Sequence, residues 1–321
     1  MKYQFTVILG IYNPNRFKTF SALNSIIKQK NINFELIIVD DGSVHSLYRE
    51  IVEFLDENNF SNYKFVENKS NQGIVKNLLS GLKISSGKYI KVVFPGDYLY
   101  DDQTLYYAWN FMEEREAILA FGDAVYYNNV GKLNIFDNSN PNFKDLYCET
   151  KEYDYNKILK YQLIFEDFIL GTSVFYKLEE YKEILEIFAL NGIKYLEDAA
   201  MIVMAVKKYR IYKMERFVIW YDFGTGITTN VNLNFSKKID ADKLKVLQYL
   251  NKNYYSIDYV KRAYKKNLFS VKDNRILREI KKSFELDCLI YRYKRKYLIK
   301  NRKCTGYDIQ KYYEWTRLLK E

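Results

Sequence analysis

Acidic residues directly follow two apolar segments near the N-terminus. Asp40 and Asp41 come after the run 34–39, and Gly96 and Asp97 follow the run 89–94. A carboxylate in such a place can accept the imide N–H of uracil, or it can hold a divalent cation that neutralises a diphosphate. Asp and Gly are also favoured in the turns that end strands, so for each pair taken alone a purely structural role stays open.

A further acidic pair, Glu197-Asp198, opens the apolar segment 199–206. In a partly apolar pocket the pKa of such a carboxylate rises, and the group can then act as a general base toward a sugar hydroxyl. Acidic residues also occur in first helical turns because they complement the helix dipole. Both interpretations stay open on these two residues alone.

Aromatic side chains accompany two of the candidate loops. Tyr12, followed by Asn13, ends the first apolar run and could stack on a nucleotide base. Trp220 and Tyr221 begin the segment 220–228, whose glycines would let a sugar approach the backbone closely. A hairpin at a β-rich edge explains this second segment as well.

The apolar patterns around these residues predict alternating strands and helices. Fully apolar runs are typical of strands inside a parallel sheet, and apolar residues three and four positions apart indicate helices. Strands are expected at 3–12, 34–39, 63–67 and 89–94, and helices at 17–30, 47–58 and 75–85. This order predicts a doubly wound α/β sheet, in which ligands bind outside the carboxyl ends of the strands. We therefore expect the acidic turns to converge on one crevice.

Composition excludes several classes of protein. The 321 residues are 48% apolar and 28% charged, which argues against global disorder. Three widely spaced cysteines argue against a disulfide scaffold or a zinc site, and the single histidine, His45, argues against His-based mechanisms. No apolar run approaches the roughly 18 residues of a membrane span, and the first residues lack the features of a signal peptide. A cytoplasmic protein is expected.

In chain order, the motifs are Tyr12-Asn13, Asp40-Asp41-Gly42-Ser43, Asn71-Gln72-Gly73, the segment 85–90, Gly96-Asp97 and Glu197-Asp198. This series resembles the family 2 inverting glycosyltransferases of the GT-A fold over about residues 4–229. The resemblance implies a Rossmann-like mixed, mainly parallel sheet flanked by helices, with a C-terminal helical extension. It implies a glycosyltransferase domain at 1–229, with a nucleotide-binding half (1–103) and an acceptor half (104–229), and a basic helical region at 230–321.

The resemblance also implies roles for individual residues. The nucleotide-binding residues would be Gly10, Tyr12, Asn13, Asp40, Asp41, Lys76, Gly96 and Asp97. Asp198 would be the catalytic base, supported by Glu197. The acceptor would contact Gly171, Thr172, Trp220 and Tyr221.

One departure from the family pattern concerns the metal. Asp97 would be the second, metal-binding Asp of the D-x-D motif, but Pro95 stands in place of the first. A single carboxylate is therefore expected to hold Mn²⁺ or Mg²⁺. The C-terminal histidine that sometimes completes the metal shell is also missing, and Tyr221, Asp222 or water would take its place.

These roles predict an inverting glycosyltransferase that moves a hexosyl or N-acetylhexosaminyl group from a nucleotide-diphosphate sugar, expected to be a UDP-sugar. The acceptor would be a hydroxyl of a glycan, lipid-linked or protein-linked molecule in bacterial polysaccharide or glycoprotein assembly. A catalytically silent nucleotide-sugar-binding protein of a glycan assembly complex is the alternative, because the D-x-D motif is incomplete. A nucleotidyltransferase is less favoured, since Gly10-Ile11-Tyr12-Asn13 is not a glycine-rich, basic phosphate loop.

Positive charge is concentrated near the C-terminus. Residues 261–303 hold 16 Lys and Arg against 4 Asp and Glu, in a chain whose net charge is +10. Aromatic and basic residues alternate within 291–298, as in segments that lie at a membrane interface. The segment could hold the protein to an anionic membrane at its inner face, bind an anionic acceptor or a partner subunit, or be the solvated face of a helical bundle. No nucleic acid is expected, because no recognised nucleic-acid motif is present.

Overall fold

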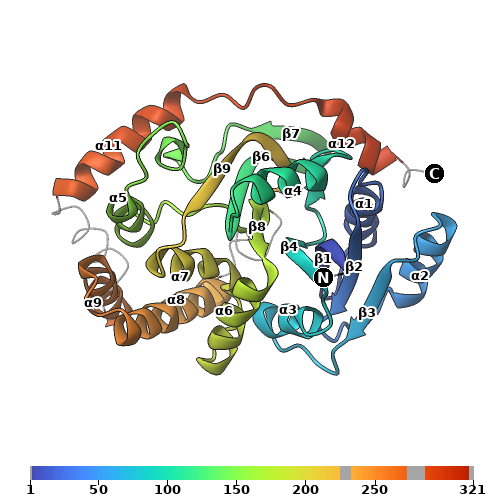
Figure 1. Ribbon diagram of the computed structural model, residues 1–321, viewed down its shortest axis with the longest axis horizontal. Helices are drawn as coiled ribbons and strands as arrows, with labels where there is room; N and C mark the ends of the chain where they lie inside the picture. The colour runs from blue at the N-terminus through green and yellow to red at the C-terminus, as the bar shows by residue number, and fades with distance from the viewer. Residues whose placement is uncertain (1, 225–232, 273–285, 318–321) are drawn as a thin grey trace.

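The computed structural model describes residues 2–224, 233–272 and 286–317. Within these residues, nine strands form one sheet in the order β3-β2-β1-β4-β8-β6-β9-β5, with β7 paired to β6 (Figure 1). The strands are β1 (Tyr3–Ile11), β2 (Phe34–Asp40), β3 (Tyr63–Glu67), β4 (Gly87–Val93), β5 (Tyr98–Leu99), β6 (Leu119–Val130), β7 (Lys132–Phe136), β8 (Val174–Lys177) and β9 (Ile211–Asp222).

The first four strands are parallel, with β1 between β2 and β4. They are joined by the helices α1 (Arg16–Ile27), α2 (Tyr48–Glu57) and α3 (Ile74–Leu82). Every residue of β2 is buried, which explains its uninterrupted apolar sequence. The predicted alternation of strands and helices is confirmed. Because these strands are parallel, the residues that follow β1, β2 and β4 emerge at one edge of the sheet.

The second half of the sheet is mixed. β8 runs antiparallel to β4 and β6, β9 runs parallel to β6, and the short β5 pairs with the end of β9. The longer helices here are α4 (Thr104–Glu114), α5 (Tyr155–Leu159), α6 (Leu178–Leu190) and α7 (Ala200–Val206). Single helical turns are η1 (Lys144–Leu146), η2 (Lys160–Ile164), η3 (Gly171–Ser173) and η4 (Glu197–Ala199).

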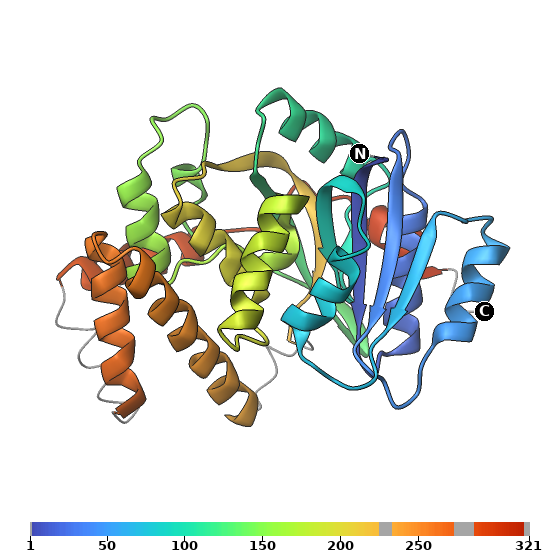
Figure 2. The ribbon, with the colours of Figure 1, turned by 60° about the horizontal axis from the view of Figure 1, so that its bottom comes forward.

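Two hydrophobic cores lie on opposite faces of the sheet, because successive strand residues point to opposite sides. Ile8 and Ile37 belong to one core, with residues of α3, α6 and α7. Phe5 and Leu36 belong to the other, with residues of α1, α2 and α4. Figure 2 shows helices on both faces of the sheet. The predicted layered α/β class is confirmed.

The chain ends in α8 (Leu233–Asn253), α9 (Asp258–Lys272), α11 (Leu286–Asn301) and α12 (Ile309–Thr316). The first two extend the core of α6 and α7. From α11, which lies near α5, the chain crosses the molecule to α12, which packs against α1 (Figure 1). The predicted boundary at 229/230 lies outside the described residues, and α12 shares the core of the first domain. No helix among the described residues is long and apolar enough to cross a bilayer.

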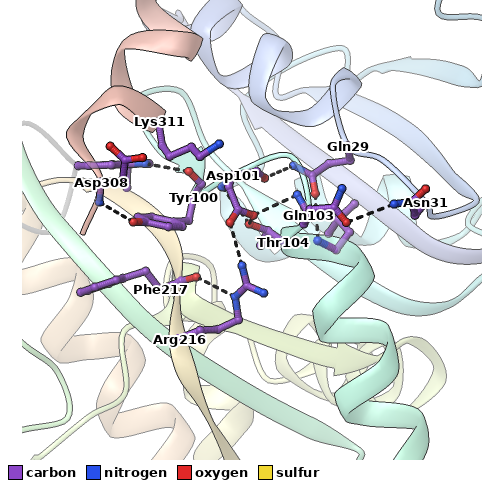
Figure 3. A network of polar contacts seen from close by, with 12 residues as sticks. Gln29, Asn31, Tyr100, Asp101, Gln103, Thr104, Arg216, Phe217, Asp308 and Lys311 are labelled. Atoms are coloured by element: carbon purple, nitrogen blue, oxygen red, sulfur yellow. Dashed lines mark hydrogen bonds and ion pairs between the residues drawn. The ribbon is translucent and has the colours of Figure 1, made fainter. Parts of the chain in front are cut away.

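A polar network joins α4, β9 and the start of α12 (Figure 3). Asp101 Oδ1 accepts hydrogen bonds from the Gln103 N–H and the Thr104 hydroxyl, each at 3.0 Å. Its Oδ2 accepts from Arg216 Nη2 at 2.8 Å. The Asp308 N–H donates to the Tyr100 hydroxyl at 2.7 Å. Asp101 is therefore a structural residue that begins α4 and binds β9.

Candidate active site

Asp41, the second acid after β2, holds the loop that opens α3. Its Oδ1 accepts the Gln72 N–H at 2.9 Å, and its Oδ2 accepts the Gly73 N–H at 2.9 Å. Burial raises the pKa of Asp41, and these two N–H groups partly oppose the rise. Both carboxylate oxygens thus stabilise the fold at a helix N-terminus, where negative charge is favourable.

Asp40, the last residue of β2, is fully buried. Its Oδ1 accepts the Ser43 N–H at 2.9 Å and the Ser43 hydroxyl at 2.6 Å, and Ser43 Oγ accepts the Asn13 N–H at 2.8 Å. Asp40 Oδ2 makes no hydrogen bond to any described residue. Tyr12, which precedes Asn13, is 46% exposed. The ends of β1 and β2 therefore form one hydrogen-bonded unit with one unused acceptor.

Asp97, after β4, meets a second carboxylate from the end of β9. Its Oδ1 accepts the Asp222 N–H at 3.3 Å. The backbone at Gly96 comes so close that a Cβ there would lie 2.7 Å from Asp222 Oδ2. Lys18 of α1 forms an ion pair with Asp222. Burial, together with the charge of Asp222, raises the pKa of Asp97 to about 7.

Lys91, in the middle of β4, fixes the turn η3. Its buried ammonium donates to the Thr172 carbonyl, and to the Val174 carbonyl at 3.3 Å. The same ammonium lies 4.3 Å from the centroid of the Phe175 ring. Burial lowers the pKa of Lys91 to about 7, and the charge of Asp97 opposes this change. Lys91 therefore holds η3 close to the loop of Asp97.

Glu197 and Asp198 begin η4, just before α7. Burial raises the pKa of Asp198 to about 6, while the N–H groups of Asp198 and Ala199 oppose the rise. Burial and then the charge of Asp198 raise the pKa of Glu197 well above its usual range. Asp198 is thus the member of the pair that ionises first. It is the better general base near neutral pH.

The loop of Asp41 contacts the segment that leads to Asp198. The Val75 N–H donates to the Lys194 carbonyl at 2.9 Å. A Cβ added at Gly73, whose N–H binds Asp41, would lie 3.0 Å from Lys194 Cβ. The first turn of α3 is therefore packed directly on the approach to η4.

The turn η3 connects Asp198 to Asp97. A Cβ added at Gly171 would lie 2.7 Å from Asp198 Cβ. The next residue, Thr172, is bound by Lys91 through its carbonyl, and its side chain lowers the pKa of Asp97, against the larger effect of burial. The loops of all three acids are thus joined by direct contacts along one edge of the sheet.

Comparison with known proteins identifies the family of this chain. Residues 12–171 match the model of glycosyl transferase family 2. The chain belongs to this family. Glycosyltransferase GlyG of Streptococcus pneumoniae serotype 4 is 25% identical over 205 residues, which are 61% of this chain and 63% of that relative. The matched part is thus less than two thirds of the relative's length.

Two solved structures resemble this family 2 chain. S. aureus TarS 1–349 in complex with UDP-GlcNAc has a TM-score of 0.56 and 21% identity, and the match covers 83% of this chain and 73% of TarS. Mannosyltransferase PcManGT from Pyrobaculum calidifontis, in complex with GDP-Man and Mn²⁺, has a TM-score of 0.52 and 11% identity over 93% and 86% of the two chains. These likenesses confirm the predicted GT-A fold.

The acids near β4 and β9 fit a divalent cation. Among the described residues, no cluster of three or more His, Cys, Asp or Glu side chains is present. Asp97 and Asp222 nevertheless supply two hard oxygen donor groups. Mg²⁺ commonly uses one or two carboxylates and completes its shell with substrate phosphates and water. The raised pKa of Asp97 also indicates a buried carboxylate that a cation would stabilise.

Three of the predicted contact residues are placed differently from the expectation. Gly10 does not line an open pocket, because a Cβ there would lie 2.8 Å from the Phe94 ring, which fills the space. Trp220 is fully buried, and its indole N–H donates to the Tyr100 carbonyl at 3.1 Å, so the predicted contact with the acceptor is wrong. Tyr221 points away from Asp222, as strand neighbours do, and its ring packs on Tyr126.

The remaining predicted residues are compatible with a site at this edge. Lys76 is exposed in the first turn of α3, next along the chain from Val75. Gly96 has a φ of +100°, a conformation that favours glycine, and it permits the approach to Asp222. The roles of these residues stay predictions.

Sequence reasoning missed Lys91 and Lys18. Lys91 carries a signal, because a lysine within the otherwise apolar run 89–94 must find buried partners. Lys18 carries none, since it lies in the first turn of α1 and meets Asp222, more than 200 residues away in the sequence, only through the fold.

Replacement of Gly171 by Ala should displace Asp198, because the added Cβ would lie 2.7 Å from Asp198 Cβ. We expect the turnover number to fall by about 10- to 100-fold, since small misplacements of a catalytic group are costly. Gly131→Ala is the matched control: its position has a φ of +77° and no atom within 4 Å. The control should lose stability and keep its turnover. Equal turnover of Gly171→Ala and the native chain would contradict this placement of Asp198.

Proposed function

We propose that this protein transfers a glycosyl group from a nucleotide-diphosphate sugar to a hydroxyl group of an acceptor. The supporting observation is that the loops of Asp41, Asp97 and Asp198 are joined at the carboxyl edge of the sheet in a chain of glycosyl transferase family 2. This edge is where open α/β sheets bind their ligands.

In the proposed reaction, Asp198 takes the proton of the acceptor hydroxyl, and the oxygen attacks the anomeric carbon. The bond from that carbon to the diphosphate oxygen breaks, and the diphosphate leaves on the opposite face with its electron pair. A single displacement of this kind inverts the configuration. A cation held by Asp97 and Asp222 would neutralise charge on the diphosphate. Lys18, paired with Asp222, adds a fixed positive charge to this corner of the site.

We propose a UDP-sugar as the donor, in agreement with the UDP-GlcNAc bound to TarS. The imide N–H of uracil needs an acceptor, and Asp40 Oδ2 is buried without a hydrogen-bond partner among the described residues. Asp41, in contrast, has both oxygens bound to main-chain N–H groups. Asp40 therefore has the free acceptor for the base, which uracil would reach by displacing the side chains that cover it, with the exposed ring of Tyr12 as a stacking surface.

The isosteric variants Asp40→Asn and Asp41→Asn should separate recognition from folding. In Asp40→Asn an amide can still accept from Ser43 while a donor replaces the unused acceptor. We expect UDP to bind about 10- to 100-fold more weakly, with little change in the melting temperature. Asp41→Asn should instead lower the melting temperature by an amount equivalent to about 1–2 kcal/mol, because it loses the cap of the α3 loop. Titration calorimetry measures the affinity for UDP, and thermal unfolding measures stability. Weaker UDP binding by Asp41→Asn together with a lower melting temperature of Asp40→Asn would assign base recognition to Asp41 and the structural role to Asp40.

An apolar cavity beside Asp198 supports an acceptor that carries an apolar group. The cavity has a volume of about 200 Å³, and Leu163, Phe168, Met201 and Val246 are among the residues that line it. A lipid-linked acceptor in the assembly of a bacterial surface glycan would place its hydroxyl at Asp198 and apolar atoms in this cavity.

A panel of UDP-, GDP- and dTDP-sugars tests the proposed function. Thermal unfolding with and without Mn²⁺ identifies the nucleotide, because a ligand that binds only the folded chain raises its stability. Release of the nucleotide in the presence of lipid-linked acceptors then measures transfer. A chain that binds a nucleotide sugar and yields no transfer or hydrolysis would be the catalytically silent scaffold instead.

A further inference from the structure

The outward face of α11 is unusually apolar for an exposed helix. Six large apolar side chains on this helix are exposed; Ile299, at 45%, lies on another face, and the other five, at 46% to 76%, are Leu286, Leu289, Ile290, Tyr293 and Tyr297. At about 100° of rotation per residue, these five positions fall within an arc of about 100°. They form a continuous strip from Leu286 to Tyr297, which we call the α11 strip.

The opposite face of α11 fixes the orientation of this strip. Cys288 and Tyr291 are buried, and the ring of Tyr291 stacks on Phe165 with centroids 4.6 Å apart and an interplanar angle of 10°. Asp287 forms an ion pair with Lys160 at 2.8 Å. These contacts prevent α11 from rotating to bury the α11 strip, which therefore faces outward in the folded protein.

Basic residues border the α11 strip. The helix carries one acid, Asp287, and five cations: Arg292, Lys294, Arg295, Lys296 and Lys300. By helical position, Lys296 lies along one side of the strip and Lys294 along the other, while Lys300 follows Tyr297 on the face of the strip itself. Long basic side chains at such borders reach anionic groups while their methylenes cover apolar surface.

We propose that the α11 strip docks this protein on the surface of an anionic lipid bilayer. Apolar and tyrosine side chains would enter the interface between headgroups and acyl chains, and the bordering cations would contact lipid phosphates. A second copy of the chain fits poorly, because each α11 carries five cations and one acid and two such faces would bring mainly like charges together. At 16 residues with five cations, α11 would lie on the bilayer and not span it.

The position of α11 also relates the membrane to the candidate active site. A groove beneath the helix is lined by Cys288, Tyr291 and Phe168, and Phe168 also lines the apolar cavity beside Asp198. With α11 docked, this groove would lie on the side of the helix away from the bilayer, because Cys288 and Tyr291 belong to the buried face opposite the α11 strip. The docking itself does not rest on the proposed function.

Flotation of the full chain with lipid vesicles tests the proposal. We expect binding to vesicles of phosphatidylcholine that contain phosphatidylglycerol, a decrease in high salt, and little binding to phosphatidylcholine alone. The combined variant Leu289→Ser, Tyr293→Ser and Tyr297→Ser should bind at least about tenfold more weakly, since each loses buried apolar area. The control replaces exposed residues elsewhere, Leu190→Ser and Tyr255→Ser, and should bind like the native chain.

A second measurement does not depend on the stability of the triple variant. The Tyr293→Trp variant should show a blue shift of its added indole emission on anionic vesicles, and Tyr255→Trp should show none. Equal flotation of the native chain and the triple variant, or no shift for Tyr293→Trp, would overturn the proposal. A dimer in lipid-free solution that the triple variant abolishes would also overturn it and would assign the strip to a second copy. Nucleotide-sugar turnover, measured in parallel, reports separately on the proposed function.

Discussion

Asp198→Asn should lose nearly all turnover and keep its affinity for the donor nucleotide. The amide cannot accept the proton of an acceptor hydroxyl, and loss of a general base reduces turnover by about 10³-fold. Asn keeps the shape of Asp198 against Gly171, so the local packing is preserved. Initial rates with saturating donor and acceptor, and calorimetry with UDP, measure the two effects separately.

The exposed acid Asp56 of α2 offers a matched control for the charge change. Asp56→Asn should leave both turnover and nucleotide affinity unchanged. If Asp198→Asn kept full transferase activity, another group would be the base, and Glu197 would be the next candidate. Conversely, equal losses of turnover and nucleotide affinity would indicate that the substitution disturbs the fold.

The pH profile gives a further check on the same residue. Burial raises the pKa of Asp198 to about 6, and a general base works only when it is deprotonated. The kcat/KM of the native chain should therefore increase with pH up to about 6 and reach a plateau above it. The residual activity of Asp198→Asn should lack this rising limb. A profile with its rise near pH 4 would mean that the base is not buried.

Local sequence is sufficient to predict the first half of the sheet. Three of the parallel strands there, β1, β2 and β4, are buried on both faces, so the apolar run of each identifies it, and polar turns mark its end. The expected strand 34–39 corresponds to β2, Phe34–Asp40, and the expected helix 75–85 corresponds to α3, Ile74–Leu82. The convergence of the acidic turns follows from parallel topology. β1 lies between β2 and β4, so the acids flank one strand.

Contacts between distant parts of the chain explain what the sequence alone does not predict. Lys18 meets Asp222 across 204 residues, and no local pattern indicates this pairing. The residues that flank Trp220 in the sequence do not distinguish a tryptophan that stacks on a sugar from one that lies in a hydrophobic core. In the fold, Trp220 packs between Tyr100, on which it stacks, and Tyr312 of α12, whose ring centroid lies 5.4 Å away. A helix that returns from the end of the chain thus decides the role of a residue in the middle.

The proposed cation site likewise combines a residue that local sequence indicates with one that only the fold brings near. Asp97 could be predicted as a metal ligand from its place after an apolar strand. Because Pro95 stands where the D-x-D motif has its first Asp, the sequence offered only this one carboxylate. The fold adds Asp222 from the end of β9, which the sequence offered only as one of several substitutes. The pair makes the incomplete D-x-D motif compatible with cation binding.

Asp97→Asn should be inactive and, without ligands, more stable than the native chain at neutral pH. The folded protein raises the pKa of Asp97 to about 7 from its usual value of 3.8, chiefly through burial. A group with a raised pKa costs stability as pH rises from the unfolded to the folded value, so the cost is largest above about pH 7. The neutral amide removes this cost and can still accept the Asp222 N–H.

The same substitution should reduce turnover by about 10²- to 10³-fold, because it removes negative charge that would hold a cation against the diphosphate. Turnover of the native chain should follow a saturable Mn²⁺ titration, and the variant should show none. Thermal unfolding in EDTA at pH 5 and pH 8 measures the stability effect, with the difference between the chains expected mainly at pH 8.

An Asp97→Asn chain that is both inactive and less stable at pH 8 would assign Asp97 a structural role. An active variant with an unchanged Mn²⁺ titration would exclude Asp97 as a metal ligand. An Asp97→Asn chain that is more stable than the native chain but has lost its turnover would show that the buried Asp97 carboxylate serves the reaction at a cost to stability.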